Sequence, residues 1–488
     1  MTDNPAAQTL HDQLATFVGE ARWFGGKGRE FEVTDVRRLG VLGASDGGPV
    51  VLLSLVELGF SGGDRELYQL PLALYSERQE RLGHALVAVD DVEGFGPSYV
   101  YDAVHDREAM DHLLRAFAEA TPHDAGGVET GAGAPSSTTG RSDGLTFHRL
   151  PGHDLDTTAH STLFSGEQSN STVMFGEDSL LKVFRKVTPG VNPDIGVHEV
   201  LTRAGSDKVA ALYGWLEARE KSGDGEPLQL AMLQQFLRTA SDGWDLALTS
   251  VRNLFAEADL HADEVGGDFA AEAARLGEAL SEVHALLAEH FPTADRSTDE
   301  MGALGATMAQ RLDAAVAIVP ELAAYAPALR GVFTAVGRLD GVTVQQIHGD
   351  LHLGQTLRTV KGWKIVDFEG EPAKPLAERV RPDSPWRDVA GMLRSFDYAP
   401  RVSAHQWGDT DGGAAQREYR AAEWSARNCT AFLEAYAGRA LTGAEQVLLD
   451  AYVVDKAVYE VVYEARNRPK WVPIPMSAIQ RLVERSPE

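Results

Sequence analysis

Residues 347 to 355, "IHGDLHLGQ", bring several side chains that could do chemistry into one short stretch. Asp350 has a histidine two positions to either side, and a second acid, Asp367, follows the strand-like run "GWKIV". Phosphoryl transfer needs such a pair, because one carboxylate orients and accepts the proton of an attacking hydroxyl while another holds magnesium on the phosphate oxygens. We therefore expect one hairpin-like unit to present Asp350 and Asp367 close together in a phosphoryl-transfer site.

Two other interpretations of this stretch stay open. His348, Asp350 and His352 could form a metal cluster, but Gly349 and Gly354 favour a loop, and the sequence has no further histidine cluster to complete such a site. A polar turn between strands is the plainer interpretation, and it leaves the second acid unexplained. His352 is suited equally to a structural hydrogen bond and to contact with a substrate.

A second group of residues fits the same chemistry. In "FSGEQSNSTVMF", the small polar residues Ser169, Asn170 and Ser171 precede a predicted strand, and backbone N–H groups there could cover phosphates. Lys182 lies in the strand-like run "LLKVFRK", where a nucleotide-binding lobe keeps an ammonium for the α- and β-phosphates. Glu199, on the following predicted helix, is the acid expected to fix this lysine. The alternatives are a lysine that extends to solvent and an exposed helix charge.

The elements around these residues predict an α+β protein. Residues 1–110 combine a short amphipathic opening with strand-like runs such as "PVVLLSLVELGF", which predict a mainly β cap subdomain. Residues 111–145 include a long Gly-, Ser-, Thr- and Pro-rich stretch and predict a flexible linker. Residues 146–238 predict a β-rich nucleotide-binding lobe. Residues 239–488 have Ala- and Leu-rich helical spacing and predict a helical lobe with the catalytic loop and the acceptor site.

The run "MLQQFLR" is suited to a hinge between these lobes, and we expect the backbone near Gln234 to Phe236 to meet adenine. Composition narrows the other partners. The formal net charge of −27 would repel nucleic acid and anionic lipid surfaces, so we expect neither as a partner. Cys429 is the single cysteine, which excludes an intramolecular disulfide. Without a signal-like opening or a long apolar run, we expect a cytoplasmic protein.

Four segments together resemble actinobacterial maltokinases, members of the aminoglycoside-phosphotransferase-like and eukaryotic-kinase-like group. They are "GEQSNSTVMFGEDSLLKVFRKVTPGVNPDI", "QQIHGDLHLGQTL", "KIVDFEGEPAKPLAERVRPDSPWRDVAGMLRSFDYA" and "DKAVYEVVYEARNRPKWVPIP". The resemblance implies a bilobal protein-kinase-like fold with an N-terminal cap. It also implies an enzyme that uses ATP and magnesium to phosphorylate maltose at its anomeric hydroxyl, and so feeds maltose 1-phosphate into glycogen and α-glucan synthesis.

Carried over residue by residue, the resemblance implies that Asp350 is the catalytic base, that Gln355 and Asp367 are metal ligands and that Lys182 binds the ATP phosphates. Gln355 stands where protein kinases have asparagine, and its amide oxygen can still bind magnesium. Asp388, in "PWRDVAGM", would support the catalytic loop from behind, together with His348. The chain departs from the family at Gly196, where relatives often carry an acid.

The acceptor site is expected in the C-terminal segment "DKAVYEVVYEARNRPKW", where Glu460 could take sugar hydroxyl hydrogens and Trp471 could lie on a sugar face. A related group with much the same terminal motif phosphorylates glucosamine to the 6-phosphate, and Glu460 could equally meet an ammonium. A catalytically inactive nucleotide-binding module is the non-enzymatic alternative. Some maltokinases associate with a trehalose-converting enzyme, and that is the protein partner which the resemblance suggests.

Overall fold

The computed structural model describes residues 9–43, 48–122, 144–164, 166, 169–219, 225–257, 260–371, 374–407 and 413–485. The chain divides into two compact units. The first contains Met1–Gly196 and Ala210–Arg238, and the second contains Val197–Val209 and Thr239–Glu488. Most of the predicted linker, residues 123–143, lies outside the described residues.

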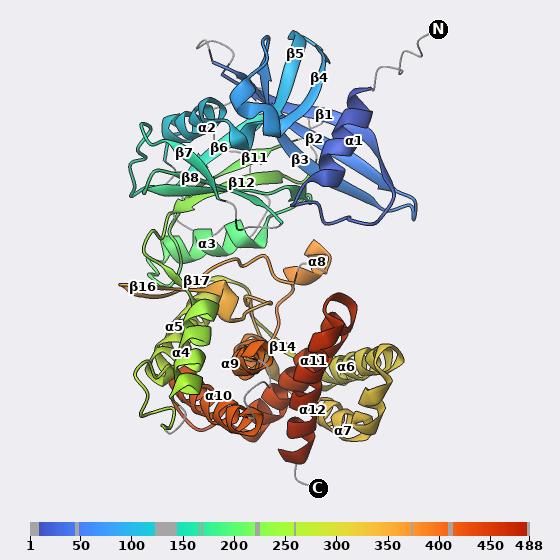
Figure 1. Ribbon diagram of the computed structural model, residues 1–488, viewed down its shortest axis with the longest axis vertical. Helices are drawn as coiled ribbons and strands as arrows, with labels where there is room; N and C mark the ends of the chain where they lie inside the picture. The colour runs from blue at the N-terminus through green and yellow to red at the C-terminus, as the bar shows by residue number, and fades with distance from the viewer. Residues whose placement is uncertain are drawn as a thin grey trace. The chain divides into compact units, whose positions relative to one another are not determined.

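The first unit contains two six-stranded sheets within its described residues, drawn from blue to green in Figure 1. The strands of the first sheet are antiparallel, in the order β1-β2-β3-β5-β4, with β10 paired to β3. Alternating and continuous apolar runs form these strands because one or both of their faces are buried. They are β1 (Phe31–Leu42), β2 (Val50–Phe60), β3 (Arg65–Tyr75), β4 (Leu86–Val92), β5 (Gly96–Asp102) and β10 (Lys186–Val187).

The second sheet of this unit is also antiparallel and has the order β6-β11-β12-β9-β8-β7. Strands β8 and β9 form a hairpin around the turn Gly176-Glu177-Asp178, and β9 carries Lys182. The strands are β6 (Leu145–Arg149), β7 (Ser161–Phe164), β8 (Ser171–Phe175), β9 (Ser179–Val183), β11 (Leu212–Ala218) and β12 (Leu228–Gln235).

Helix α1 (Leu10–Glu20) begins with a capping box between Thr9 and Asp12, and α2 (Arg107–Glu119) is capped by Asp106. Helix α2 corrects the predicted start of the linker at residue 111. Its apolar positions follow helical spacing and are buried, which favours a packed helix over a flexible segment. Helix α3 (Pro193–Arg203) begins in the first unit and continues into the second.

In its described residues the first unit has two large apolar cores and a smaller one that includes Phe184 and Met232. One large core combines β2 with α2 and the second sheet, and it includes Leu53, Phe117 and Leu233. The other large core combines α1 with the first sheet, and it includes Leu14 and Tyr68. Each six-stranded sheet therefore has a buried face, as its strand patterns predict.

The second unit is mainly helical, as residues 239–488 predict, and its helices run from green-yellow to red in Figure 1. One large apolar core joins these helices to the catalytic loop. The helices are α4 (Gly243–Ala256), α5 (Ala270–His290), α6 (Thr298–Ile318), α7 (Ala326–Val336), α8 (Leu376–Arg379), α9 (Trp386–Trp407), α10 (Ala414–Ala437), α11 (Gly443–Asn467) and α12 (Pro473–Arg485).

Short strands complete this unit. Strands β13 (Ser241–Asp242), β16 (Thr356–Thr359) and β17 (Gly362–Ile365) form one small sheet, and β14 (Ala294–Arg296) pairs with β15 (Val342–Val344). The stretch "IHGDLHLGQ" follows β15 and leads into the β16–β17 hairpin, which ends just before Asp367. The α+β class, with a mainly β first part and a helical last part, is thus confirmed. In the described part of the chain, no helix is long and apolar enough to cross a membrane.

Candidate active site

The predicted catalytic loop is anchored by Asp388, in the first turn of α9. Its carboxylate accepts hydrogen bonds from the backbone N–H groups of His348, at 2.7 Å, and Gly349, at 2.9 Å. It also accepts one from His284 Nε2 at 3.1 Å, and Asp388 is 1% exposed. Burial alone would raise the pKa of Asp388, but the hydrogen bond and charge of His284 and the backbone donors outweigh it and lower the pKa. Asp388 therefore stays ionised and fixes the start of the loop.

His348 links the loop to the end of β17. Its Nδ1 accepts a hydrogen bond from the backbone N–H of Asp350 at 3.3 Å, and its Nε2 lies 3.0 Å from the carbonyl oxygen of Val366. Both contacts are satisfied by a neutral imidazole with its proton on Nε2. Between these residues Gly349 has a φ of +84°, a left-handed conformation that favours glycine. His348 thus ties the backbone at Asp350 to the backbone at Val366, which directly precedes Asp367.

Asp350 is held by a lysine from a distant helix. Lys456, on α11, places Nζ 2.9 Å from Asp350 Oδ1, and the two side chains are 30% and 23% exposed. Burial lowers the pKa of Lys456, but the charge and hydrogen bond of Asp350 outweigh it, so the pKa is raised overall. Asp350 Oδ2 accepts no hydrogen bond within the described part of the chain, so this oxygen is open to a substrate hydroxyl. Lys456 has no role in the site as predicted from the sequence.

Asp367 and Gln355 lie side by side, as the hairpin predicts. Gln355 Nε2 donates to Asp367 Oδ2 at 3.0 Å, and oxygens of Asp367 and Glu369 lie within 4.8 Å of each other. Asp367 has a φ of +67°, a positive value that no other non-glycine residue in the described ranges has. Such strain persists where the surrounding structure imposes it, often at functional sites. Carboxylate and amide oxygens are the donors that magnesium prefers, so these residues fit that ion.

A pocket of about 180 Å³ opens beside Asp350 in the second unit. Lys456, Tyr459, Tyr452 and Arg311 contribute to its wall together with the catalytic loop. Each carboxylate in this wall already has a partner. Asp350 contacts Lys456, and Asp455 contacts Arg311 at 2.6 Å. The other acids pair in the same way: Glu371 with Lys374 and Arg387, Asp383 with Arg296 and Arg387, and Asp388 with His284.

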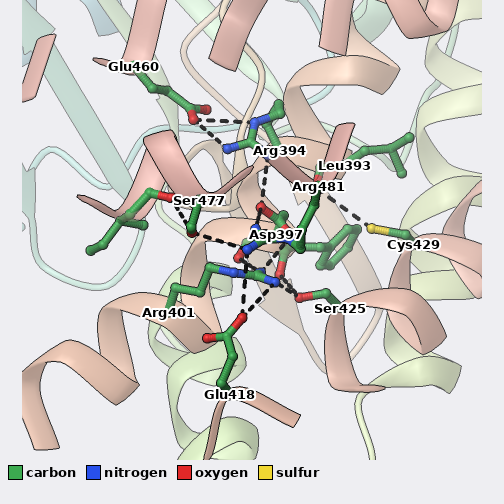
Figure 2. Close-up of polar contacts among 12 residues, drawn as sticks. Leu393, Arg394, Asp397, Arg401, Glu418, Ser425, Cys429, Glu460, Ser477 and Arg481 are labelled. Carbon is green, nitrogen blue, oxygen red and sulfur yellow. Dashed lines mark hydrogen bonds and ion pairs between the residues drawn. The ribbon is translucent and has the colours of Figure 1, made fainter. Parts of the chain in front are cut away.

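The predicted acceptor residues Glu460 and Trp471 are not among the residues that line this pocket, and their role in acceptor binding stays a prediction. Glu460 accepts from Arg394 Nη2 at 2.6 Å, and Arg394 in turn contacts Asp397 at 2.9 Å (Figure 2). Burial raises the pKa of Glu460, although Arg394 acts in the opposite direction. Trp471 packs under the guanidinium of Arg468, 4.4 Å from its ring centre. Glu460 is therefore engaged in an ion pair with the buried Arg394, and this contact joins α11 to α9.

The aromatic residues at the pocket are instead Tyr452 and Tyr459. Tyr459 lies one turn beyond Lys456 on α11, and Lys456 Nζ is 5.1 Å from its ring centre. Lys456 and Tyr459 have an i, i+3 spacing, which puts both side chains on one helix face. This spacing is the sequence signal that could have predicted their pairing. His352 lies on the same loop as Asp350, and its Nδ1 accepts from the backbone N–H of Gly354 at 3.1 Å. Burial lowers the pKa of His352 despite the nearby charge of Asp350, which favours the neutral ring.

The phosphate-binding residues predicted for the first unit centre on Lys182. Its Nζ lies 2.8 Å from Asp194 Oδ2, and both side chains are buried. Glu199 instead forms an i, i+4 pair with Arg203 at 2.9 Å. The prediction of Glu199 as the partner of Lys182 is therefore wrong, because Asp194, in the first turn of α3, reaches the lysine.

The remaining predicted nucleotide contacts also lie in the first unit. Ser169 is exposed, whereas Asn170 and Ser171 are buried, and Ser171 Oγ accepts from Arg185 Nε at 2.8 Å. The hydroxyl of Ser171 is therefore used within the protein. Gln234 lies in β12, and the backbone N–H of Phe236 donates to Asp178 at 3.1 Å. The chain leaves the first unit after Arg238, just beyond these residues.

Comparison with known proteins finds a family match for the N-terminal part of the chain and similar kinases for a larger part of it. Residues 17–106 match the family model described as the maltokinase N-terminal cap domain. A glucosamine kinase from Streptacidiphilus jiangxiensis is 31% identical over 333 residues, which are 65% of this chain and 73% of the relative. A glucosamine kinase from Mycolicibacterium smegmatis (strain ATCC 700084 / mc(2)155) is 26% identical over 336 residues, 65% of this chain and 78% of the relative.

Solved structures share the fold. A glucosamine kinase in complex with glucosamine, ADP and inorganic phosphate superimposes with a TM-score of 0.66 at 23% identity, covering 99% of this chain and 100% of the other. A second crystal form of glucosamine kinase gives a TM-score of 0.67 at 24% identity, covering 93% and 94% of the two chains. The chain therefore belongs to the family of sugar kinases that includes the Streptacidiphilus jiangxiensis glucosamine kinase, and it has the fold of the solved glucosamine kinases with an N-terminal cap domain.

Proposed function

We propose that this chain transfers the γ-phosphoryl group of ATP to the anomeric hydroxyl of maltose and so forms maltose 1-phosphate for α-glucan synthesis. The maltokinase-type cap at residues 17–106 and the "HGDLHLGQ" and "DFEGEP" segments support this choice. The observation that carries it is the state of the acceptor pocket, where every acid in the wall already has a partner.

That pairing favours a neutral acceptor for an electrostatic reason. An ammonium group on the substrate would bring a further positive charge next to the cation that each of these carboxylates already contacts, such as Lys456 at Asp350 or Arg311 at Asp455. Like charges this close repel each other, and displacing the resident cation instead would leave a partly buried charge uncompensated. Sugar hydroxyl groups can instead donate to the carboxylates and accept from the cations while the pairs stay intact. Maltose offers only such groups.

In the reaction, Asp350 Oδ2 accepts the proton of the acceptor hydroxyl. The acceptor oxygen forms a bond to the γ-phosphorus, and the bond from that phosphorus to the bridging oxygen of ADP breaks. Lys456 orients the Asp350 carboxylate so that Oδ1 is occupied and Oδ2 is open. Asp388 and His348 keep the loop in place during this step. Most of the catalysis is then positioning and charge stabilisation, as phosphoryl transfer requires.

Gln355 and Asp367 would hold a magnesium ion, with Glu369 close to Asp367. When bound, the ion neutralises charge on the phosphate oxygens of ATP. In the first unit, Lys182 would bind the α- and β-phosphates, fixed by Asp194. Association with a trehalose-converting enzyme that supplies maltose remains part of this proposal.

The test is ADP release from the purified chain with ATP and magnesium, with maltose, glucosamine, glucose or no sugar in parallel, followed by phosphorus NMR of the product. Maltose-dependent turnover that gives an anomeric phosphate is the expected result. Asp350→Asn serves as the matched inactive variant, since it keeps the size of the side chain but not its basicity. Turnover with glucosamine alone, or none above the no-sugar rate, would reject the maltose assignment.

A second candidate is glucosamine phosphorylation to the 6-phosphate, because the two curated relatives carry that name. It predicts that a substrate ammonium replaces one cation of the pocket wall. The variant Arg311→Gln tests this directly, because it frees Asp455 for an ammonium. Under the glucosamine hypothesis the KM for glucosamine falls in this variant, whereas under the maltose hypothesis the KM for maltose rises and glucosamine stays a poor acceptor.

A further inference from the structure

A second pocket, of about 140 Å³, lies on the second unit next to the acceptor pocket. The two pockets share part of their walls, namely Gly349, Glu371, Lys374, Asp383 and Arg387. The wall of the second pocket contains five cationic and three acidic side chains. In a chain whose formal net charge is −27, this local excess of positive charge is unusual. It creates a positive potential beside the catalytic loop.

Two of the three acids are already used more than once. Asp383 contacts Arg296 at 2.9 Å and Arg387 at 3.1 Å, and Tyr452 donates to it at 2.8 Å. Glu371 contacts both Arg387, at 3.1 Å, and Lys374, at 3.0 Å. Each of these two acids therefore already contacts two cations, and in the described part of the chain neither contacts the remaining guanidinium groups of the wall.

Those remaining groups are Arg379 and Arg381, from the segment that ends α8. Arg379 Nη1 donates to the carbonyl oxygen of Glu369 at 3.0 Å, while its buried Nε has no hydrogen-bond partner among the described residues. Arg381 is exposed and forms no ion pair within the described ranges. A buried N–H without an acceptor is costly, so it marks a place where an acceptor is expected from outside the chain.

We propose that this pocket binds the phosphate group of a phosphomonoester, the class to which a sugar phosphate belongs. Guanidinium groups match the geometry and charge of phosphate oxygens. Arg381 has no ion-pair partner in the described ranges, and Arg379 has a buried Nε without an acceptor there, so the two side chains can donate to a dianion. Because the pocket adjoins the acceptor site, a sugar phosphate held there keeps its sugar next to Asp350 and slows the next turnover. The anion site itself is inferred from the charges of the wall and is independent of which sugar is the acceptor.

Isothermal titration of the full chain tests this without nucleotide and with EDTA present, using inorganic phosphate and glucose 1-phosphate as probes. Arg381→Gln and Arg379→Gln are expected to weaken binding of both probes by about fivefold or more, since each removes a charge-assisted donor. Glu378→Gln removes the third acid of the wall and is expected to strengthen binding by about twofold, which a folding defect cannot mimic. Arg338→Gln, at another exposed arginine of the second unit, is the matched control and leaves binding unchanged.

Tighter binding of glucose 1-phosphate than of inorganic phosphate supports a sugar phosphate as occupant, whereas equal affinity supports recognition of the phosphate group alone. Binding that is unchanged in both arginine variants, or that is lost in Lys182→Met instead, would overturn the proposal, as would the absence of binding to the unmodified chain. The outcome is separable from the maltose assignment. A chain that is inactive on maltose but loses phosphate affinity in Arg381→Gln would refute only the proposed substrate.

Discussion

Replacing Lys456 with methionine would remove the cation that lies against the proposed general base. The methionine keeps most of the length and apolar surface of the lysine stem, so the change acts mainly on the charge and its hydrogen bond to Asp350. Lys456 Nζ is 2.9 Å from Asp350 Oδ1, and both side chains are partly buried. No other hydrogen bond orients the Asp350 carboxylate within the described part of the chain, so its position depends on this contact.

The size of the effect follows from this geometry. Two unit charges about 4 Å apart attract by about 4 kcal/mol at the effective dielectric constant of a protein surface. Desolvation and side-chain ordering offset part of this, and hydrogen bonds to charged groups contribute about 1.5–3 kcal/mol net. If that stabilisation is lost in the transition state, kcat falls by about 10- to 100-fold. The KM for ATP should change little, because Lys456 contacts Asp350 and Tyr459 and, in the described part of the chain, none of the predicted phosphate-binding residues.

The assay is steady-state ADP release at saturating sugar and magnesium, with Lys456→Arg and Lys470→Met measured alongside. Lys456→Arg keeps the charge and should recover most of the lost kcat, while Lys470→Met removes an exposed lysine beyond the end of α11 and should be neutral. If Lys456→Met keeps kcat within about twofold of the unmodified chain, then this lysine neither orients nor neutralises Asp350. If Lys456→Arg is as slow as Lys456→Met, the charge is not the property that matters.

The same pair makes a prediction for stability. The pKa of Lys456 is raised in the folded chain, because the charge of Asp350 outweighs burial. A group with a raised pKa stabilises the folded state fully below its unfolded pKa, about 10.4 for lysine, and loses that contribution as pH rises through the folded value. The difference in free energy of unfolding between the unmodified chain and Lys456→Met should therefore stay constant between about pH 6 and 9 and shrink above about pH 10.4. Denaturant unfolding at several pH values measures it.

Three further predictions concern the supporting residues. Asp388→Asn removes a fully buried charge that fixes the predicted catalytic loop. We expect kcat to fall about 100-fold and the free energy of unfolding to fall by about 2–4 kcal/mol, as measured by kinetics and denaturant unfolding. Because the pKa of Asp388 is lowered in the folded chain, the stabilisation that it provides should be lost as pH falls below about 3.9. Lys182→Met and Asp194→Asn should each raise the KM for ATP about tenfold or more, whereas Glu199→Gln should leave it unchanged, and equal effects of all three would contradict the assigned pair. Asp367→Asn should raise the magnesium concentration for half-maximal rate by about tenfold or more, which a magnesium titration at fixed ATP would detect.

What the sequence predicts well in this protein is local. Asp350, Gln355 and Asp367 lie within one loop and one hairpin, so their spacing along the chain already fixes which side chains can meet. The β8–β9 hairpin places Lys182 in a strand for the same reason. The roles predicted for these residues, as base, metal ligands and phosphate lysine, remain predictions, and the experiments above are designed to test them.

Contacts between distant segments were harder to predict, and Glu460 shows why. Helical periodicity correctly places Lys456 and Glu460 one turn apart on a polar stripe of α11, away from the buried valines. Periodicity does not say which neighbouring element that stripe faces. Within one turn of α11, the neighbour of this stripe changes from the predicted catalytic loop to α9. Lys456 therefore contacts Asp350, while Glu460 contacts the buried Arg394. The partner of each residue is decided by packing between helices that lie far apart in sequence.

The error at Glu199 has a different cause, which is geometric and could have been avoided. Successive residues of an α-helix are rotated by about 100°, so positions five apart, such as 194 and 199, differ by about 140° and cannot both face one strand. Only one of the two acids on α3 can therefore serve the lysine of β9. Asp194 is the better placed, because it lies in the first turn, directly after the loop that brings the chain back to that strand. Glu199 instead forms an ion pair with Arg203, one turn later on the same helix, and this pair satisfies its carboxylate without Lys182.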